Sequence, residues 1–344
     1  MKVAILIPTK NRPDFIERTI AYYDSLKSAH PIYIGDASGP EIAARITAFI
    51  KRFNNVDVRY FHWEDLGVMQ AKVKLAEEAL GECVYCTYHG DDDYFIPSSL
   101  SKCAEFLSKN PDYRTAQGRA ASFALDRPGP FGKIRWVNEY WGVNALEQET
   151  SAERLVSFDK KYFVTQFSTH RTEEFVQDSE YYLQVKDDLV GELLHCFTFS
   201  IKGKSKFLDC LYLIRNTHEG ISHLLLWDWM LQEHWSSDYH KTLNALALAL
   251  QESSDFSLSN ARKLVSKVLN ARIEKTVMAK GEIYKMSLST KFGKYFPAPL
   301  KEVIRGLIIN DASDMRLLRS KKSLFYDDFL PVVNSLTKKE SGRG

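Results

Sequence analysis

The stretch "VYCTYHGDDDYFIPSSL", residues 84–100, decides the architecture of the N-terminal part of this 344-residue chain. Its apolar start, Val84–Tyr88, is typical of a buried strand, and Ser98–Ser108 continues it as an amphipathic helix. Between them stand the adjacent carboxylates of Asp91–Asp93, which repel one another and raise each other's pKa. Either open solvent or a cation has to offset that repulsion.

The alternation of strand and helix extends back to the N-terminus. Further strands are predicted at Val3–Ile7, Ile32–Ile34 and Val56–His62. Helices are predicted after Pro13, over Pro40–Phe53 and over Val68–Leu80. Continuous apolar strands that alternate with helices indicate an α/β fold with a mostly parallel sheet covered on both faces.

Polar side chains follow three of these strands, at Thr9–Arg12, Asp36–Ser38 and Asp91–Asp93. Ligands of parallel sheets bind beyond the carboxyl ends of the strands. Oxygen ligands suit Mg²⁺ or Mn²⁺, which proteins commonly share with the phosphates of a substrate. A solvated acidic loop is the alternative, but its position after a buried strand favours a metal site.

The remainder of the chain divides into two kinds of sequence. Residues 126–182 are aromatic-rich and irregular, so they either wall a pocket or form an ordinary packed insertion. The periodicity turns helical around His240–Lys280, and the tail keeps this character. We therefore predict an α/β domain over residues 1–235 and a helical C-terminal region over residues 236–344.

The charge is uneven, although the net charge is only +2. Residues 261–344 carry 18 Lys and Arg against 8 Asp and Glu, whereas the first 260 residues carry 28 against 36. An acidic front part argues against a nucleic-acid partner. The basic tail, with "KFGKYFPAPLKEVIRGLIIN" at 291–310, permits a peripheral contact with an anionic membrane or packing on a second copy of the chain.

Other features of the sequence bear on the cellular location of the protein, and two common nucleotide-binding motifs are absent. The five cysteines are an odd number, no N-x-[ST] sequon occurs, and no apolar run approaches the 18–20 residues or so of a membrane span. These features predict a cytoplasmic protein, which the basic tail could hold at the inner face of the membrane. Neither G-x-x-x-x-G-K-[ST] nor G-x-G-x-x-G is present.

Four motifs, taken in order, resemble those of the family 2 glycosyltransferases, which use nucleotide sugars and have the GT-A fold. "VAILIPTKNRP" is similar to the opening strand and its nucleotide-contacting loop, and "IYIGDASG" to the strand whose final aspartate holds the base. "GVMQAKVKLAEEALGE" resembles the helix that usually reads A-R-N, and "GDDDYFIPSSL" resembles the D-x-D motif with its following proline. The resemblance covers roughly residues 1–220.

The resemblance implies a nucleoside-diphosphate-sugar donor and a divalent ion, Mn²⁺ or Mg²⁺. The implied donor-binding residues are Pro8, Thr9, Arg12, Asp36, Lys72 and Asp91, and the implied metal ligands are Asp92, Asp93 and His218. Two departures stand out. Counting back from Pro97, the first aspartate of the motif falls on Gly90, and Lys72 replaces an arginine, which loses bidentate geometry.

Inverting members of the family use a carboxylate at a helix start as the general base. "QVKDDLVGELLHCFTFSIKGK" resembles that segment and offers Asp187 and Asp188. Asp188 is the favoured base because a leucine follows it directly. The alternative role of Asp187 is to cap the N-terminus of the helix, which requires no catalysis.

The sequence thus predicts a metal-dependent, inverting glycosyltransferase that acts on a hydroxyl group of a glycan, a lipid-linked molecule or a small molecule. A metal-dependent nucleotidyltransferase is one alternative, and a non-catalytic sugar-nucleotide-binding or scaffold protein is another.

Overall fold

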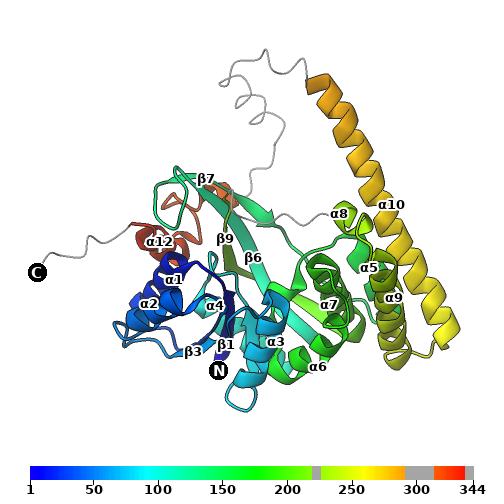
Figure 1. Ribbon diagram of the computed structural model, residues 1–344, viewed down its shortest axis with the longest axis horizontal. Helices are drawn as coiled ribbons and strands as arrows, with labels where there is room; N and C mark the ends of the chain where they lie inside the picture. Colours follow the sequence, from blue (N-terminus) through cyan, green and yellow to red (C-terminus); the bar gives the residue numbers. More distant parts are fainter. Residues whose placement is uncertain (219–225, 291–313, 338–344) are drawn as a thin grey trace, which may run out of the picture.

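The computed structural model describes residues 1–218, 226–290 and 314–337. Within these ranges the strands form one mixed sheet in the order β3-β2-β1-β4-β8-β6-β9-β5, with β7 paired to β6 (Figure 1). The strands are β1 (Val3–Thr9), β2 (Ile32–Asp36), β3 (Val58–His62), β4 (Tyr85–Tyr88), β5 (Tyr94–Phe95), β6 (Tyr113–Leu125), β7 (Ile134–Trp141), β8 (Thr169–Arg171) and β9 (Lys204–Asn216).

The four strands at the start of that order are parallel, as the sequence predicts. Strand β8 then runs antiparallel to both β4 and β6, β9 is parallel to β6, and β5 is antiparallel to β9. The predicted α/β class, with a mixed sheet that is parallel in its N-terminal part and a helical C-terminal region, is confirmed.

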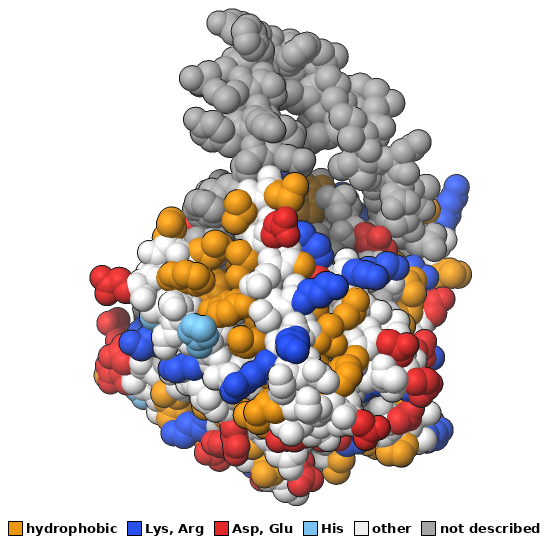
Figure 2. Space-filling model, turned by 90° about the vertical axis from the view of Figure 1, so that its right-hand side faces the viewer, with side chains coloured by type: hydrophobic (Ala, Val, Ile, Leu, Met, Phe, Trp, Pro, Cys, Tyr) orange, Lys and Arg blue, Asp and Glu red, His pale blue; other side chains and the backbone are white. Residues whose placement is uncertain are grey.

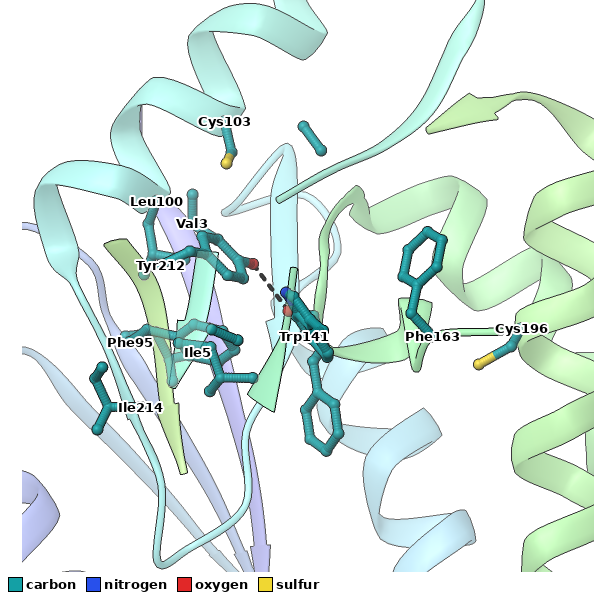
Figure 3. Close-up of a cluster of buried hydrophobic side chains, with 14 of the residues drawn as sticks. Val3, Ile5, Phe95, Leu100, Cys103, Trp141, Phe163, Cys196, Tyr212 and Ile214 are labelled. Atoms are coloured by element: carbon teal, nitrogen blue, oxygen red, sulfur yellow. Dashed lines mark hydrogen bonds between the residues drawn. The ribbon is translucent and has the colours of Figure 1, made fainter. Parts of the chain in front are cut away.

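Alternation along β1 gives each face of the sheet its own helices. Val3, Ile5 and Ile7 pack with α1 (Pro13–Ser25) and α4 (Pro97–Lys109). Ala4 and Leu6 point to the other face, towards α3 (Val68–Ala79) and α6 (Thr172–Tyr182). Figure 3 shows Val3 and Ile5 beside side chains of α4, β5 and β9. Helix α2 (Pro40–Ile50) lies between β2 and β3 in the chain. Period-two burial on both faces explains why the strand is apolar throughout.

The segment of residues 126–182, which the sequence predicts to wall a pocket or to form a packed insertion, contains regular structure and contributes residues to the core and to a cavity wall. It holds β7, β8, α6 and also α5 (Ser151–Lys160) and the short 3₁₀ helix η1 (Thr165–Phe167). Helix α5 begins with a capping box in which Thr150 and Glu153 exchange side-chain and backbone hydrogen bonds. The aromatic content of the segment hid these elements, because its side chains pack into the core from several directions.

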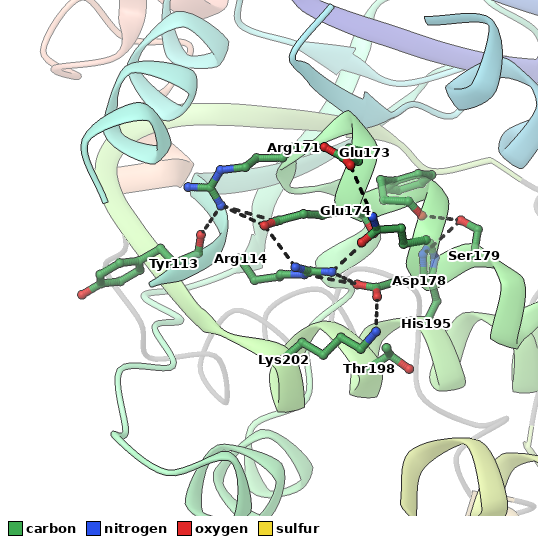
Figure 4. A network of polar contacts seen from close by, with 12 residues as sticks. Tyr113, Arg114, Arg171, Glu173, Glu174, Asp178, Ser179, His195, Thr198 and Lys202 are labelled. Carbon is green, nitrogen blue, oxygen red and sulfur yellow. Dashed lines mark hydrogen bonds and ion pairs between the residues drawn. The ribbon is translucent and has the colours of Figure 1, made fainter. Parts of the chain in front are cut away.

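A buried ion network ties α6 and α7 (Asp188–Lys202) to β6 (Figure 4). Asp178 is fully buried between the Arg114 guanidinium and the Lys202 ammonium, each at 2.8 Å. Glu174 lies 3.0 Å from Arg114. Because a buried charge is tolerated only when it is paired, these contacts hold the two helices at one position on the sheet.

The C-terminal helices pack on different parts of the α/β domain. Helix α9 (Trp235–Glu252) contacts α7, and α10 (Leu258–Thr290) contacts α9, α5 and the short α8 (Leu226–Met230). The 3₁₀ helix η3 (Asp314–Leu317) returns to β7 and α12 (Tyr326–Ser335) returns to α1. There the Ser335 hydroxyl donates to the Tyr94 hydroxyl at 2.9 Å. The boundary after residue 235 stays a prediction.

The side of the molecule that carries α9 and α10 mixes Lys and Arg with exposed hydrophobic side chains (Figure 2). Leu248 of α9 and Met278 of α10 are exposed hydrophobic side chains. In the described ranges no helix combines the length and apolarity needed to cross a membrane. The basic stretch 291–310 lies outside the described residues, so the predicted location, membrane contact and self-association stay predictions.

Gly118 stands where the register between β6 and β9 shifts. A Cβ there would meet the Cys210 carbonyl oxygen at 2.4 Å and the Tyr212 Cβ at 3.0 Å. We predict that Gly118→Ala lowers the free energy of unfolding by about 1–3 kcal/mol in urea denaturation, the usual cost of overpacking. The control is Gly39→Ala, because a Cβ at Gly39 has nothing within 4 Å. Equal losses in the two variants would contradict the close approach.

Candidate active site

The three carboxylates after β4 are buried: Asp91 is 5% exposed, Asp92 is 6% exposed and Asp93 is 0% exposed. Their repulsion is therefore not relieved by solvent. The chain's own cations offset it. The Arg12 guanidinium donates to Asp91 and, at 3.0 Å, to Asp92, while Arg215 Nε donates to Asp93 at 3.0 Å. Guanidinium groups of the chain itself thus offset the repulsion among the three carboxylates.

The three carboxylates point to different partners. Asp91 also accepts from the Thr9 hydroxyl at 2.7 Å. Asp92 Oδ2 lies 2.8 Å from His218 Nε2. Asp93 turns inward, where its second oxygen accepts the Asn216 backbone N–H at 3.2 Å. The structure therefore brings Asp92 and His218 together and pairs Asp93 with Arg215 and the Asn216 backbone.

Burial and ion pairing shift the three pKa values in different directions. Burial and the Asp92 charge raise the pKa of Asp91 to about 7, against the pull of Arg12. Burial raises the pKa of Asp93 to about 6, against the pull of Arg215. For Asp92, burial is outweighed by the hydrogen bond with His218 and the Arg12 charge, which hold its pKa well below the usual range. Asp92 is thus the member that keeps its negative charge most firmly.

Gly90 occupies the position where the D-x-D motif usually has its first aspartate. A Cβ at Gly90 would lie 3.0 Å from a carboxylate oxygen of Asp92 and 3.0 Å from one of Asp93. Both distances are too short for ordinary contact. A side chain at Gly90 would therefore require these two carboxylates to shift by a few tenths of an ångström.

A cavity of about 470 Å³ opens beyond the ends of β1 and β4, and we call it the strand-end cavity. Of the residues predicted to bind the donor, Pro8, Thr9, Arg12 and Asp91 line it. Asp36 does not. It is 0% exposed, and its carboxylate accepts the Ser38 N–H at 2.9 Å and the Tyr60 hydroxyl at 2.7 Å.

A second cavity of about 460 Å³, which we call the helix α7 cavity, shares Val68, Tyr88, Phe167 and Arg215 with the strand-end cavity. Lys72 lines this cavity rather than the strand-end cavity. Its ammonium donates to Gln166 Oε1 at 2.5 Å, and Gln166 Nε2 donates to Glu192 at 2.6 Å. Burial lowers the pKa of Lys72 to about 8 and raises the pKa of Glu192.

The two aspartates at the start of α7 do different things. Asp187 is the N-cap, because its carboxylate accepts the N–H groups of Leu189 at 3.0 Å and Val190 at 3.1 Å. Asp188 lines the helix α7 cavity and is exposed to solvent at its edge. Partial burial and the Asp187 charge raise the pKa of Asp188, against the pull of Lys72.

The sequence did not predict several polar residues of these cavities, among them Gln166, Glu192, Arg215 and Asn216. Only Glu192 left a signal in the sequence, since it is an acidic residue one turn after Asp188, between the apolar pairs 189–190 and 193–194. The other three reach the site through η1 and β9, whose position depends on contacts distant in sequence.

Residues 4–172 match the model of a protein family described as Glycosyl transferase family 2. No curated protein matches the chain.

Similar solved structures include TarS of S. aureus, with 13% identity, a TM-score of 0.48, and coverage of 78% of this chain and 43% of that chain. This chain therefore spans less than half of the TarS chain in that structure. The TarS 1–349 fragment in complex with UDP is 11% identical, with a TM-score of 0.49 and coverage of 98% and 89%. The mannosyltransferase PcManGT from Pyrobaculum calidifontis, in complex with GDP-Man and Mn²⁺, is 12% identical, with a TM-score of 0.44 and coverage of 85% and 82%. These similarities are too low to infer the activity of this chain from those structures.

The buried pair of Asp93 and Arg215 should matter for stability. We predict that Arg215→Gln lowers the free energy of unfolding by about 2–4 kcal/mol at pH 8, because it leaves the fully buried Asp93 carboxylate without its counter-charge. The matched control is Asp209→Asn, which breaks the pair with Arg119 at a carboxylate that is 72% exposed. There the expected loss is under about 1 kcal/mol. Similar losses in urea denaturation would show that Arg215 is not an internal counter-ion.

Proposed function

This chain resembles the family 2 glycosyltransferases over residues 4–172, and we propose that it moves a sugar from a nucleoside-diphosphate sugar to an acceptor hydroxyl group. One observation carries the proposal. The strand-end cavity, with its paired acid cluster, adjoins the helix α7 cavity, which has a carboxylate at its edge. A donor can thus span both cavities, with its diphosphate at Arg12 and its sugar facing Asp188.

The donor's nucleotide is assigned to the strand-end cavity. Pro8, Thr9 and Asp91 form its wall, and the guanidinium groups of Arg12 and Arg215 complement the charge of the diphosphate. Asp36 is assigned to hold the nucleobase of the donor. Because its side chain is fully buried, a direct contact requires the Tyr60 hydroxyl or Ser38 to move aside.

A divalent ion, Mn²⁺ or Mg²⁺, is part of the proposal. Among the described residues no group of three or more His, Cys, Asp or Glu side chains is placed to hold a metal. Asp92 Oδ2 and His218 Nε2 lie 2.8 Å apart, and Nη2 of Arg12 lies 3.0 Å from the first and 2.8 Å from the second. Such ions commonly take one or two protein ligands and complete their shell with substrate phosphates and water, so this pair fits an ion once the Arg12 guanidinium turns away from it. Bound there, the ion would stabilise the negative charge of the leaving diphosphate.

The residues at the helix α7 cavity supply the base. The Asp188 carboxylate takes the proton of the acceptor hydroxyl, whose oxygen forms a bond to the anomeric carbon as the bond to the diphosphate oxygen breaks. Attack from the side opposite the diphosphate inverts the anomeric carbon. Asp187 orients the start of α7 through its capping bonds and thereby positions Asp188. The acceptor is a glycan, a lipid-linked molecule or a small molecule.

Incubation with a panel of UDP- and GDP-sugars and Mn²⁺ tests the activity. Release of free nucleoside diphosphate together with a glycosylated acceptor supports the proposal. Pyrophosphate release from a nucleoside triphosphate and a sugar phosphate would instead indicate a nucleotidyltransferase. Binding of nucleotide sugars without turnover of any acceptor would indicate a non-catalytic protein.

Chelation tests the metal. We predict that EDTA abolishes turnover and that Mn²⁺ restores it. Asp92→Asn and His218→Ala should each weaken the apparent Mn²⁺ affinity by at least about 10-fold, since each removes one of two protein ligands. Asp209→Asn, far from the cavity wall, serves as the control. If EDTA-treated protein keeps its full rate, Arg12 and Arg215 alone balance the diphosphate and the metal assignment fails.

The adjacent aspartates of α7 test the base. Asp188→Asn should lower kcat by about 10²–10⁴-fold while nucleotide-sugar binding persists, because an amide cannot take the hydroxyl proton. Asp187→Asn should cost about 1 kcal/mol of stability or less, with little change in kcat. The acid limb of the wild-type kcat profile should lie above the ordinary carboxyl pKa of about 4, since the pKa of Asp188 is raised and the ionised form is the active one. If Asp187→Asn lowers kcat strongly and Asp188→Asn has little effect, Asp187 is the general base instead.

A further inference from the structure

The Asn216 side chain, at the end of β9, is 1% exposed. Its backbone N–H donates to Asp93, but neither Oδ1 nor Nδ2 of its carboxamide has a hydrogen-bond partner within the described part of the chain. A buried carboxamide that lacks partners costs free energy, and the great majority of buried polar side chains are satisfied. Such a group at a cavity wall therefore points to a ligand that completes it.

Asn216 lines two cavities. It lines the helix α7 cavity and also a third cavity of about 670 Å³, which the loop of residues 124–129 forms with the start of α1. The preceding residue, Arg215, lines both the strand-end cavity and the helix α7 cavity. Asn216 thus follows directly after a residue of the cavity assigned to the diphosphate, and it shares the helix α7 cavity with Asp188.

The chemistry of the carboxamide restricts its ligand. It presents one acceptor oxygen and a donor NH₂ group side by side. A phosphate group can satisfy only Nδ2, and a metal ion only Oδ1. Neighbouring hydroxyl groups of a sugar satisfy both, because one hydroxyl donates to Oδ1 while the next accepts from Nδ2.

The wall of the helix α7 cavity offers the same mixed chemistry at a second place. The Lys72 ammonium, the Gln166 amide and the Glu192 carboxylate form one chain of hydrogen bonds within this wall. The Lys72 ammonium also lies over the rings of Tyr88 and Tyr182, at 5.0 and 4.5 Å from their centroids. Donors, acceptors and aromatic faces around one cavity suit a sugar ring better than an apolar or purely anionic ligand.

We propose that Asn216 is a specificity-determining residue whose carboxamide binds two neighbouring hydroxyl groups of the sugar being transferred. This inference rests on the proposed function. A sugar joined to a diphosphate at Arg12 enters the helix α7 cavity past Arg215 and reaches Asn216. A sugar that lacks one of the two hydroxyl groups leaves the carboxamide partly unsatisfied and is rejected for that reason.

Calorimetry with Asn216→Leu, a variant of similar volume, tests this assignment. The probes are UDP, GDP, UDP-glucose, UDP-GlcNAc and GDP-mannose, each with Mn²⁺. We expect the variant to bind the matching nucleoside diphosphate within twofold of wild type and to bind the nucleotide sugar at least about 10-fold more weakly. The thermal stability of the ligand-free variant should equal or exceed that of wild type, because the unsatisfied polar atoms are gone. Asn260→Leu, at an exposed position of α10, is the control.

The possible failures are distinguishable. If wild type binds none of the probes, the proposed function fails and this inference fails with it. If wild type binds a nucleotide sugar and Asn216→Leu binds it equally well, only this inference is overturned. It is also overturned if the variant loses nucleoside diphosphate and nucleotide sugar to the same extent, or if only the acceptor KM rises, since the hydroxyl pair would then belong to the acceptor.

Discussion

The pairing of two guanidinium groups with three buried aspartates is the constraint on which the rest of this structure depends. Arg12 lies 79 positions before Asp91, and Arg215 lies 122 positions after Asp93. The ends of β1, β4 and β9 must therefore meet at one place, because an unpaired buried carboxylate would be too costly. The acid cluster thereby connects the parallel part of the sheet to the mixed part. It also fixes the wall shared by the strand-end cavity and the helix α7 cavity.

The charge distribution across the two cavities follows from this arrangement. Where the strands end, Arg12 and Arg215 are paired with Asp91–Asp93. On α7 the carboxylates of Asp188 and Glu192 line the other cavity together with the Lys72 ammonium. Helix α7 keeps its place through the buried network around Asp178, and Asp187 caps its first turn. In the proposed reaction the guanidinium groups face the diphosphate and the Asp188 carboxylate faces the acceptor hydroxyl group.

The sequence predicted the first four strands well because each is a short, continuous apolar run followed by an amphipathic helix. It did not predict β6 and β9, which are 13 residues long and mix charged and apolar residues around shifts in register. The residues of the candidate site also fall into a predicted group and a group that was not predicted. Thr9, Arg12 and Asp91–Asp93 follow directly from strand ends, whereas Arg215, Asn216 and Gln166 depend on packing between segments far apart in the chain. Local sequence patterns carry no information about packing between distant segments, so they do not predict the positions of these three residues.

Binding of UDP and GDP to wild type and to Arg12→Gln, measured by calorimetry in the presence of Mn²⁺, tests the central claim most directly. The account predicts that wild type binds one of the two and that Arg12→Gln binds it about 10–100-fold more weakly, the effect of losing a charge-assisted contact with the diphosphate. Wild-type affinity in the Arg12→Gln variant, or no binding of either nucleotide to wild type, would contradict a diphosphate site at the acid cluster.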